Sequence, residues 1–367
     1  MKKKMMFSAA AFVILLAAVV MIKKVNTGME RELKEERMED VSVPLSGKYI
    51  ETENPVEFSG RWFPKEIDGE NLMITVNDGA MLYFKVKGTD SVTAEFVEIS
   101  QLETPYFAYI IDEGEPVRQK VTDGVIPLPD QGEHVVQIVI DGMTEREDKW
   151  NGEIGVAFDK IDSNGGKITG VVPEKKRILF IGDSITEGVM ALGDVAVSDY
   201  NSATNSFPWF TAKELEAEPY FIGFGATGIV ETGSFNNCSN MLDYYSASRT
   251  AEIPECDLIV LNTGTNDLEA DSSVFVEGYR EVVLKLHDRY PDVQIVCMIP
   301  FTQLHREDIY NAVTDYPWCC VAETAEWELT YTEGLHPDRE GAKKAAAYLA
   351  EYIRRNLKDF YIGKNHV

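Results

Sequence analysis

Ser184 lies in the stretch FIGDSITEG, where an apolar run, RILFIG, gives way to polar residues. This pattern predicts a buried strand followed by a sharp turn into a helix, which would expose the serine hydroxyl. The backbone N–H of Ser184 would then lie at the start of the helix, where negative charge is stabilised. Ser184 is therefore a candidate nucleophile for acyl transfer, a reaction that also needs a base and donors for the oxyanion.

Two later segments offer such donors, because each also follows an apolar run. Gly225 lies in GFGATG after the run PYFI, and Asn266 lies in GTND after the run DLIVLN. In a parallel sheet the carboxyl ends of the strands meet at one edge. We therefore expect the backbone N–H of Gly225 and the side-chain amide of Asn266 to lie beside Ser184.

The stretch TEGLHPDREG offers the base. His336 precedes an amphipathic segment near the C-terminus, and Glu333 lies three residues before it. A short turn could bring the Glu333 carboxylate to Nδ1 of His336 and leave Nε2 facing Ser184. The alternative is a surface loop in which Asp338 caps the following helix, which accounts for Asp338 but not for the other residues.

In the order GDSITEG, GFGATG, GTND and EGLHPD, the four segments resemble the four blocks of the SGNH (GDSL-type) hydrolase family. The resemblance implies that Ser184 is the nucleophile and His336 the base. It also implies that the backbone N–H groups of Ser184 and Gly225, with the Asn266 amide, form the oxyanion hole. No cofactor and no metal ion are expected.

Two positions depart from the pattern of this family. Gly223 stands where the family usually has Asn, and Glu333 stands where it usually has Asp. Because Glu333 has one more methylene than Asp, its carboxylate could reach His336 or miss it. We expect a supporting catalytic role for Glu333.

The elements that would position these residues indicate an α/β protein with two domains. Residues 177–360 alternate apolar strands with amphipathic segments, which predicts a three-layer, flavodoxin-like parallel sheet with crossover helices. Residues 46–165 show short alternating runs separated by Gly and Asp turns, which predicts an antiparallel β-sandwich. Residues 166–176, rich in glycine and charge, are expected to be a linker.

A jelly-roll-like sandwich followed by an SGNH domain resembles the carbohydrate esterases of family two, which remove acetyl groups from sugars. Residues that support the resemblance include SGRW around Arg61 and the strand FVEISQ. Members with this architecture often lack the acid of the triad, which agrees with a supporting role for Glu333.

The N-terminus carries an uncharged, mostly apolar run, residues 5–22, with lysines on both sides. A helix of this length spans about 27 Å, close to the thickness of a bilayer core. The run lacks a clear signal-peptidase site. We therefore expect residues 1–24 to be a single-pass membrane anchor with an extracytoplasmic catalytic domain, followed by a charged spacer over residues 25–45. A secreted protein is the alternative.

Four further residues are candidates for substrate contact. Asp183 lies beside the serine, and His305 follows an apolar run in a loop that could border the site. Trp209 and Trp327 could stack on the apolar faces of sugars, with packing in the core as the alternative.

The formal net charge is −26 in 367 residues, and such a field repels phosphate backbones, so nucleic acid is not an expected partner. The expected function is an extracytoplasmic serine esterase that deacetylates a carbohydrate through an acyl-enzyme. One alternative is a lipid esterase or thioesterase with the same machinery. Another is a carbohydrate-binding surface protein with a decayed hydrolase domain. The glycan, the hydroxyl position and the oligomeric state are not predicted.

Overall fold

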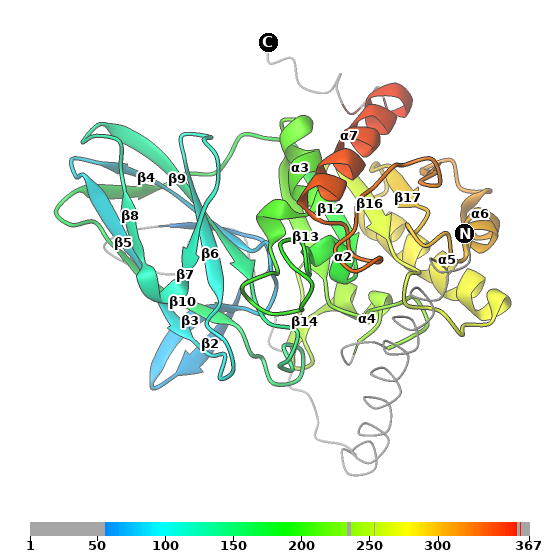
Figure 1. Cartoon of the computed structure of the whole chain (residues 1–367), viewed down its shortest axis with the longest axis horizontal. Coiled ribbons are helices and arrows are strands. Elements are labelled where there is room, and N and C mark those ends of the chain that lie inside the picture. Colours follow the sequence, from blue (N-terminus) through cyan, green and yellow to red (C-terminus); the bar gives the residue numbers. More distant parts are fainter. Residues whose placement is uncertain (1–55, 233–235, 253, 358–359, 361–367) are drawn as a thin grey trace, which may run out of the picture. The chain divides into compact units, whose positions relative to one another are not determined.

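In the computed structural model, two antiparallel sheets, whose strands are interleaved along the chain, precede a parallel sheet (Figure 1). The model describes residues 56–232, 236–252, 254–357 and 360. The predicted membrane anchor and spacer lie outside these residues and stay predictions. In the described part of the chain, no helix combines the length and apolarity needed to cross a membrane.

The antiparallel part contains two sheets with the strand orders β1-β4-β9-β6-β7, in which β11 also pairs with β4, and β2-β3-β10-β5-β8. The strands of the first sheet are β1 (Glu57–Ser59), β4 (Met81–Lys87), β6 (Tyr106–Ile111), β7 (Val117–Lys120), β9 (Glu133–Gly142) and β11 (Lys167–Gly170). Those of the second are β2 (Phe63–Ile67), β3 (Glu70–Thr75), β5 (Ser91–Glu98), β8 (Val125–Pro127) and β10 (Val156–Asp162), and a short 3₁₀ helix, η1 (Val121–Asp123), precedes β8.

Alternate side chains of strand β4 pack in two different hydrophobic clusters, one on each face of the strand. Leu82 and Phe84 pack in the cluster between the two antiparallel sheets. Met81 and Tyr83 point to the opposite face of β4, where they pack with Phe221 of the parallel-sheet domain. Both faces of this sheet are therefore buried in this region, and the sandwich packs firmly against its neighbour.

The predicted linker, residues 166–176, is partly a strand. Its residues Lys167–Gly170 form β11, which pairs with β4 in antiparallel register from Lys167 opposite Lys87 to Gly170 opposite Phe84. Gly165 and Gly166 lie just before this strand, where Gly165 has a φ of 89° and turns the chain, and Gly170 is its last residue.

The second domain contains a parallel sheet with the order β13-β12-β16-β17-β18. Its strands are β12 (Arg177–Gly182), β13 (Glu218–Gly223), β16 (Leu258–Asn262), β17 (Ile295–Met298) and β18 (Cys319–Ala322). The helices are α2 (Ser184–Glu187), η2 (Ala203–Asn205), α3 (Phe207–Glu214), α4 (Cys238–Asp243), α5 (Ser272–Arg289), α6 (Arg306–Val313) and α7 (Arg339–Asn356). A small hairpin joins β14 (Tyr244–Ser246) to β15 (Arg249–Thr250).

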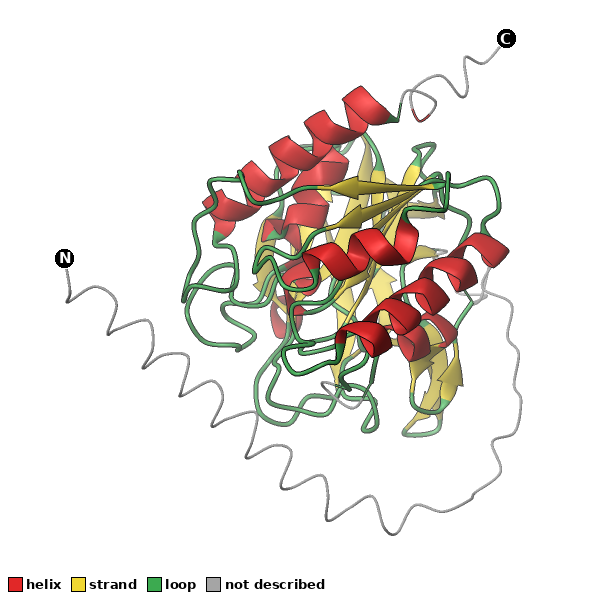
Figure 2. Cartoon of the chain, turned by 90° about the vertical axis from the view of Figure 1, so that its right-hand side faces the viewer, coloured by secondary structure: helices red, strands yellow, loops and turns green. Residues whose placement is uncertain are grey.

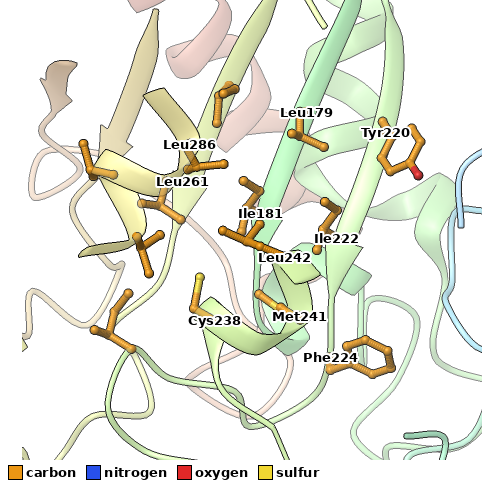
Figure 3. Close-up of a cluster of buried hydrophobic side chains, with 14 of the residues drawn as sticks. Leu179, Ile181, Tyr220, Ile222, Phe224, Cys238, Met241, Leu242, Leu261 and Leu286 are labelled. Atoms are coloured by element: carbon orange, nitrogen blue, oxygen red, sulfur yellow. The ribbon is translucent and has the colours of Figure 1, made fainter. Parts of the chain in front are cut away.

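Helices cover both faces of this sheet, so its strands are apolar on both sides (Figure 2). On β12, Leu179 and Ile181 pack in a cluster that includes Met241 and Leu242 of α4 (Figure 3). The alternate residues Ile178 and Phe180 pack in the cluster that contains residues of α3 and α7. The prediction of an α/β domain with crossover helices is confirmed.

The edge strand β13 packs against the sandwich. Asn77, in the turn between β3 and β4, donates from Nδ2 to the carbonyl of Gly223 at 2.9 Å. Gly79, in the same turn, has a φ of 84°, and a Cβ on it would lie 2.3 Å from the Phe221 ring. The sandwich thus covers a strand edge that would otherwise be open to pairing with another chain.

This close approach predicts the effect of adding one methyl group. Gly79→Ala should lower the free energy of unfolding by about 2–5 kcal/mol, through a left-handed backbone and a clash with Phe221. Gly69 is the matched control, because its φ is 88° and nothing lies within 4 Å of its added Cβ. Gly69→Ala should cost only about 1–2 kcal/mol, the backbone share. Urea denaturation measures both, and equal losses would mean that the turn does not press against Phe221.

Candidate active site

The three segments that carry the candidate nucleophile and donors begin at aligned strand ends. Gly182, the last residue of β12, lies opposite Gly223 of β13 and Asn262 of β16. The loops that follow the three strands therefore leave the sheet at one level. This alignment brings Ser184, Gly225 and Asn266 to the same edge, as the strand pattern predicted.

Ser184 is the first residue of the short helix α2, and its side chain is partly exposed. Asp183 caps the helix, because its Oδ1 accepts a hydrogen bond from the N–H of Ile185 at 2.9 Å. The helix ends after one turn at Gly188, which has a φ of 88°. The segment is thus a tight strand-to-helix turn that holds the serine at its apex.

His336 lies on a narrow turn between Tyr331 and Pro337, which form an isolated antiparallel bridge. Thr332 N–H donates to the carbonyl of His336 at 2.9 Å, and Gly334 allows the reversal with a φ of 102°. Asp338 accepts from the N–H of Gly341 and caps α7, as expected for the surface-loop alternative as well. The turn brings the side chains of residues 333 and 336 to the same side.

A continuous hydrogen-bond chain joins Glu333, His336 and Ser184. Glu333 Oε1 lies 2.6 Å from His336 Nδ1, and His336 Nε2 lies 2.8 Å from Ser184 Oγ. Burial alone would raise the pKa of Glu333, but the hydrogen bond from His336 lowers it below its usual value. An ionised Glu333 accepts a hydrogen bond from Nδ1–H, which leaves Nε2 unprotonated and able to take the proton of the serine hydroxyl. The longer side chain of Glu333 therefore reaches the histidine.

Donors for an oxyanion lie around the serine. In the described part of the chain, the backbone N–H groups of Ser184 and Gly225 donate to no protein acceptor. Asn266 Nδ2 donates to the carbonyl of Thr227 at 2.9 Å and, over 3.3 Å, to Asp183 Oδ2. The two backbone groups are free for a ligand, and the long contact with Asp183 is the weaker of the two that Asn266 makes.

Asp267, next to Asn266, organises the loop after β13. Its carboxylate is fully buried and accepts from the N–H groups of three consecutive residues, Ile229–Glu231, at 2.8–2.9 Å. A Cβ on Gly228 would lie 2.6 Å from its Oδ1, so this glycine makes room for the carboxylate. The second and third sequence blocks are thereby tied together.

Two of the residues predicted to contact substrate, Asp183 and His305, make hydrogen bonds within the protein. His305 donates from Nε2 to the Asp267 carbonyl at 2.7 Å, while its Nδ1 lies 2.8 Å from Asp308. With both ring nitrogens engaged, His305 supports the Asp267 loop. Asp183 is fully buried, and burial raises its pKa to about 6. Its carboxylate accepts hydrogen bonds from the N–H of Ile185, which caps α2, and from Asn266 Nδ2.

The two tryptophans pack on other side chains. Trp209 is buried in a cluster with Tyr83 and Phe221, between the sandwich and the parallel-sheet domain. Trp327 is partly buried and stacks on Tyr348 with a centroid distance of 5.4 Å. Both tryptophans therefore pack on aromatic side chains of the protein.

An open cavity of about 470 Å³ on the surface lies beside the histidine turn, and its lining was not predicted. One wall consists of residues that follow the serine segment in the sequence, and the other consists of residues on both sides of His336. A hydrogen bond joins the two walls, because Thr332 Oγ1 donates to the Met190 carbonyl at 2.9 Å. Its lining residues are Ala191, Leu192, Gly193, Tyr331, Thr332, Asp338, Arg339 and Glu340. The only feature of the sequence that could have indicated these residues is their position close to the first and fourth sequence blocks.

Comparison with known proteins supports this picture. Residues 180–344 match the model of the GDSL-like lipase/acylhydrolase family. Over 164 residues the chain is 29% identical to the cellulase/esterase CelE of Acetivibrio thermocellus, an alignment that covers 39% of this chain and 20% of CelE. The aligned region thus spans about a fifth of that curated relative.

Solved structures share the whole two-domain fold. A family two carbohydrate esterase from Clostridium thermocellum, solved with cellohexaose, superposes with a TM-score of 0.68 at 22% identity and covers 83% of this chain and 99% of its own. The acetyl xylan esterase Est2A from the rumen bacterium Butyrivibrio proteoclasticus has a TM-score of 0.66 at 18% identity, over 84% and 96% of the two chains.

The family resemblance inferred from the four sequence blocks is confirmed, because the matched region contains all of them. The chain combines this region with an antiparallel domain, as the family two carbohydrate esterases do. Residues 180–344 of the second domain thus match the GDSL-like lipase/acylhydrolase family, and this match supports a serine ester hydrolase.

Proposed function

We propose that this protein is an esterase that removes acetyl groups from a carbohydrate through an acyl-enzyme on Ser184. The observation that carries the proposal is the hydrogen-bond chain from Glu333 through His336 to Ser184 Oγ, with steps of 2.6 and 2.8 Å. This arrangement can activate a hydroxyl group as a nucleophile at neutral pH.

In the proposed acylation, Ser184 Oγ attacks the ester carbonyl carbon while its proton passes to His336 Nε2. The resulting oxyanion accepts hydrogen bonds from the free N–H groups of Ser184 and Gly225. Asn266 adds a third donor by giving up its long contact with Asp183. The imidazolium then protonates the departing sugar oxygen, and the acetyl group stays on Ser184.

In the proposed deacylation, His336 takes a proton from a water molecule, which attacks the acetyl carbonyl. The second tetrahedral intermediate collapses, the proton on His336 returns to Ser184 Oγ, and acetic acid leaves and loses its proton to solvent. Glu333 holds the required tautomer and stabilises the imidazolium in both halves of the reaction. All these steps use groups that belong to the chain, the substrate or water.

Two observations favour a carbohydrate over a lipid. Charged side chains, Asp338, Arg339 and Glu340, line the cavity beside the histidine turn, and such a lining suits a polar substrate better than a long acyl chain. The shared fold also extends over the sandwich, and the compared Clostridium thermocellum esterase was solved with cellohexaose. The net charge of −26 favours a neutral polysaccharide over a polyanionic one.

A binding protein with a decayed catalytic domain is a less suitable description. In a hydrolase domain that has lost its activity, side chains that act only in catalysis would no longer need to keep their arrangement. Here Ser184, His336 and Glu333 retain hydrogen-bond geometry, and the Ser184 and Gly225 N–H groups remain free in the described part of the chain. We therefore keep the binding function as an outcome of the assay below.

Acyl-chain preference tests the proposed reaction. Acetyl, octanoyl and palmitoyl esters of one chromophore, followed by absorbance, should be hydrolysed by the wild-type protein in that order of decreasing kcat/KM. Ser184→Ala should abolish turnover with unchanged circular dichroism. Faster cleavage of the palmitoyl ester would indicate a lipid esterase, and no hydrolysis of any ester by a folded wild-type protein would favour the binding function.

The role of Glu333 can be separated from that of His336. Glu333→Gln should lower kcat/KM on an acetyl ester by less than about 100-fold, because the amide oxygen still accepts from Nδ1 and water can reach this site. The Glu333 side chain is 27% exposed. His336→Ala, which removes the base, should cost much more. Rates measured between about pH 5 and 9 would contradict a supporting role if both variants were equally inactive.

A further inference from the structure

Asn77 of the sandwich contacts the strand that leads to the oxyanion hole. Its Nδ2 donates to the carbonyl of Gly223 at 2.9 Å, two residues before Gly225. The Asn77 side chain is only 1% exposed, and its backbone N–H donates to Thr75 Oγ1 at 3.1 Å. A buried amide held in this way fixes the carboxyl end of β13.

Lys149 of the sandwich contacts the helix that carries the nucleophile. Its Nζ lies 2.8 Å from Oε1 of Glu187, which is the last residue of α2 and follows Ser184 by one helical turn. The same ammonium group lies 2.5 Å from Glu145 and 3.8 Å from Asp78, two further residues of the sandwich. Lys149 and Glu187 are both at least nine-tenths buried.

The Lys149 cluster is a buried group of one ammonium and three carboxyl side chains. The carboxylates of Asp78, Glu145 and Glu187 offer oxygens that all lie within 4.8 Å of one another, close enough for one metal ion, and the Lys149 ammonium lies among them. Burial raises the pKa of Asp78 to about 7 and that of Glu187 well above its usual value. Loss of the ammonium would leave the buried carboxyl groups without their hydrogen-bond partner, which is costly in low dielectric, so the cluster holds its parts in one arrangement.

The two segments that the sandwich contacts, the carboxyl end of β13 and helix α2, also pack against each other. A Cβ on Gly223 would lie 3.2 Å from Glu187 Cγ and 3.3 Å from the Asp183 carbonyl. The absence of a side chain at Gly223 therefore lets the Glu187 chain pass between the serine segment and β13. A shift of Asn77 or Lys149 would move the Ser184 and Gly225 segments relative to each other.

We propose that Asn77 and Lys149 make the sandwich a part of the acyl-transfer site, as positioning residues that keep the N–H groups of Ser184 and Gly225 aimed at one oxyanion. Neither residue contacts the reacting atoms. The inference rests on the proposed esterase function, and it assigns to the sandwich a catalytic role in addition to any role in binding a substrate.

Strand β13 offers a matched pair of variants. Ser59 of the sandwich donates from Oγ to Glu218 at the amino end of the strand, and Asn77 donates to Gly223 at its carboxyl end. Asn77→Ala should lower kcat on an acetyl ester by about tenfold or more, with KM changed by less than about threefold, because small displacements of catalytic groups are costly. Ser59→Ala should lower thermal stability and leave kcat within about twofold.

Glu187 supplies a second pair, in case the loss of Asn77 prevents folding. Glu187→Gln keeps an acceptor for Lys149 and the contact with Gly223, so kcat should stay within about threefold of wild type. Glu187→Ala removes both and should lower kcat by about 100-fold, with little change in KM. Circular dichroism and thermal melting accompany each assay.

The outcomes separate this inference from the proposed function. If wild type does not hydrolyse the acetyl ester, or Ser184→Ala retains activity, the proposed function fails. If Ser184→Ala is inactive but Asn77→Ala and Ser59→Ala have the same kcat and differ only in stability, the positioning role is overturned. Equal kcat for Glu187→Gln and Glu187→Ala would contradict it as well.

Discussion

The register of three parallel strands is the constraint on which the rest of the site depends. Gly182 pairs with Gly223 on one side and with Asn262 on the other, so the segments after β12, β13 and β16 start level with one another. A slip of one residue in either pair would turn alternate side chains to the opposite face of the sheet. The apolar layers on both faces oppose such a slip, since every residue of β16 is buried.

The histidine turn must meet this edge from a distant part of the sequence. Ser184 and His336 are separated by 152 positions, and their hydrogen bond forms only when α7 packs on the sheet. Small residues of α7, Ala342, Ala345 and Ala346, are buried and permit a close approach. The geometry of the triad is therefore a product of core packing, and the short turn around Gly334 orients only its last two members.

The sandwich is bound to the active-site domain by buried polar contacts and is not a separate, flexibly linked module. Besides its hydrogen bonds to β13 and α2, it forms hydrogen bonds with the loop before α3. Asp141 accepts from Arg118 at 2.7 Å, from Ser202 Oγ at 2.8 Å and from the N–H of Thr204 at 2.7 Å. These buried polar contacts are satisfied on both sides, which makes relative motion of the two domains costly.

Much of the site could be predicted from the sequence, because glycine and polar residues after apolar runs mark strand ends. This rule explains the prediction of Ser184, Gly225 and Asn266, whereas His336 was predicted from its loop before the last helix and from Glu333 three residues earlier. It could not distinguish the polar residue that faces the solvent from the one that supports its neighbour. Asp183 and His305 lie at strand ends or loops, yet both are held by buried hydrogen bonds.

The contacts between the domains were beyond the reach of sequence patterns. Asn77 lies in an Asn-Asp-Gly turn and Lys149 in a charged stretch, features that are typical of exposed loops. Both are buried in the structure, where Asn77 contacts the end of β13 and Lys149 contacts Glu187 of α2. The strand β11 was missed for a related reason, because its pairing partner β4 lies about 80 residues earlier and short polar strands carry a weak local signal.

A crystal structure of the protein inhibited by an acyl-sized phosphonate would test the central claim most directly, since the adduct mimics the tetrahedral intermediate. The account predicts a bond between phosphorus and Ser184 Oγ. One phosphonyl oxygen should lie about 2.7–3.1 Å from the nitrogens of Ser184 and Gly225 and from Nδ2 of Asn266, with the contact to Asp183 broken. An adduct on another residue, or an oxygen that faces away from all three donors, would contradict it.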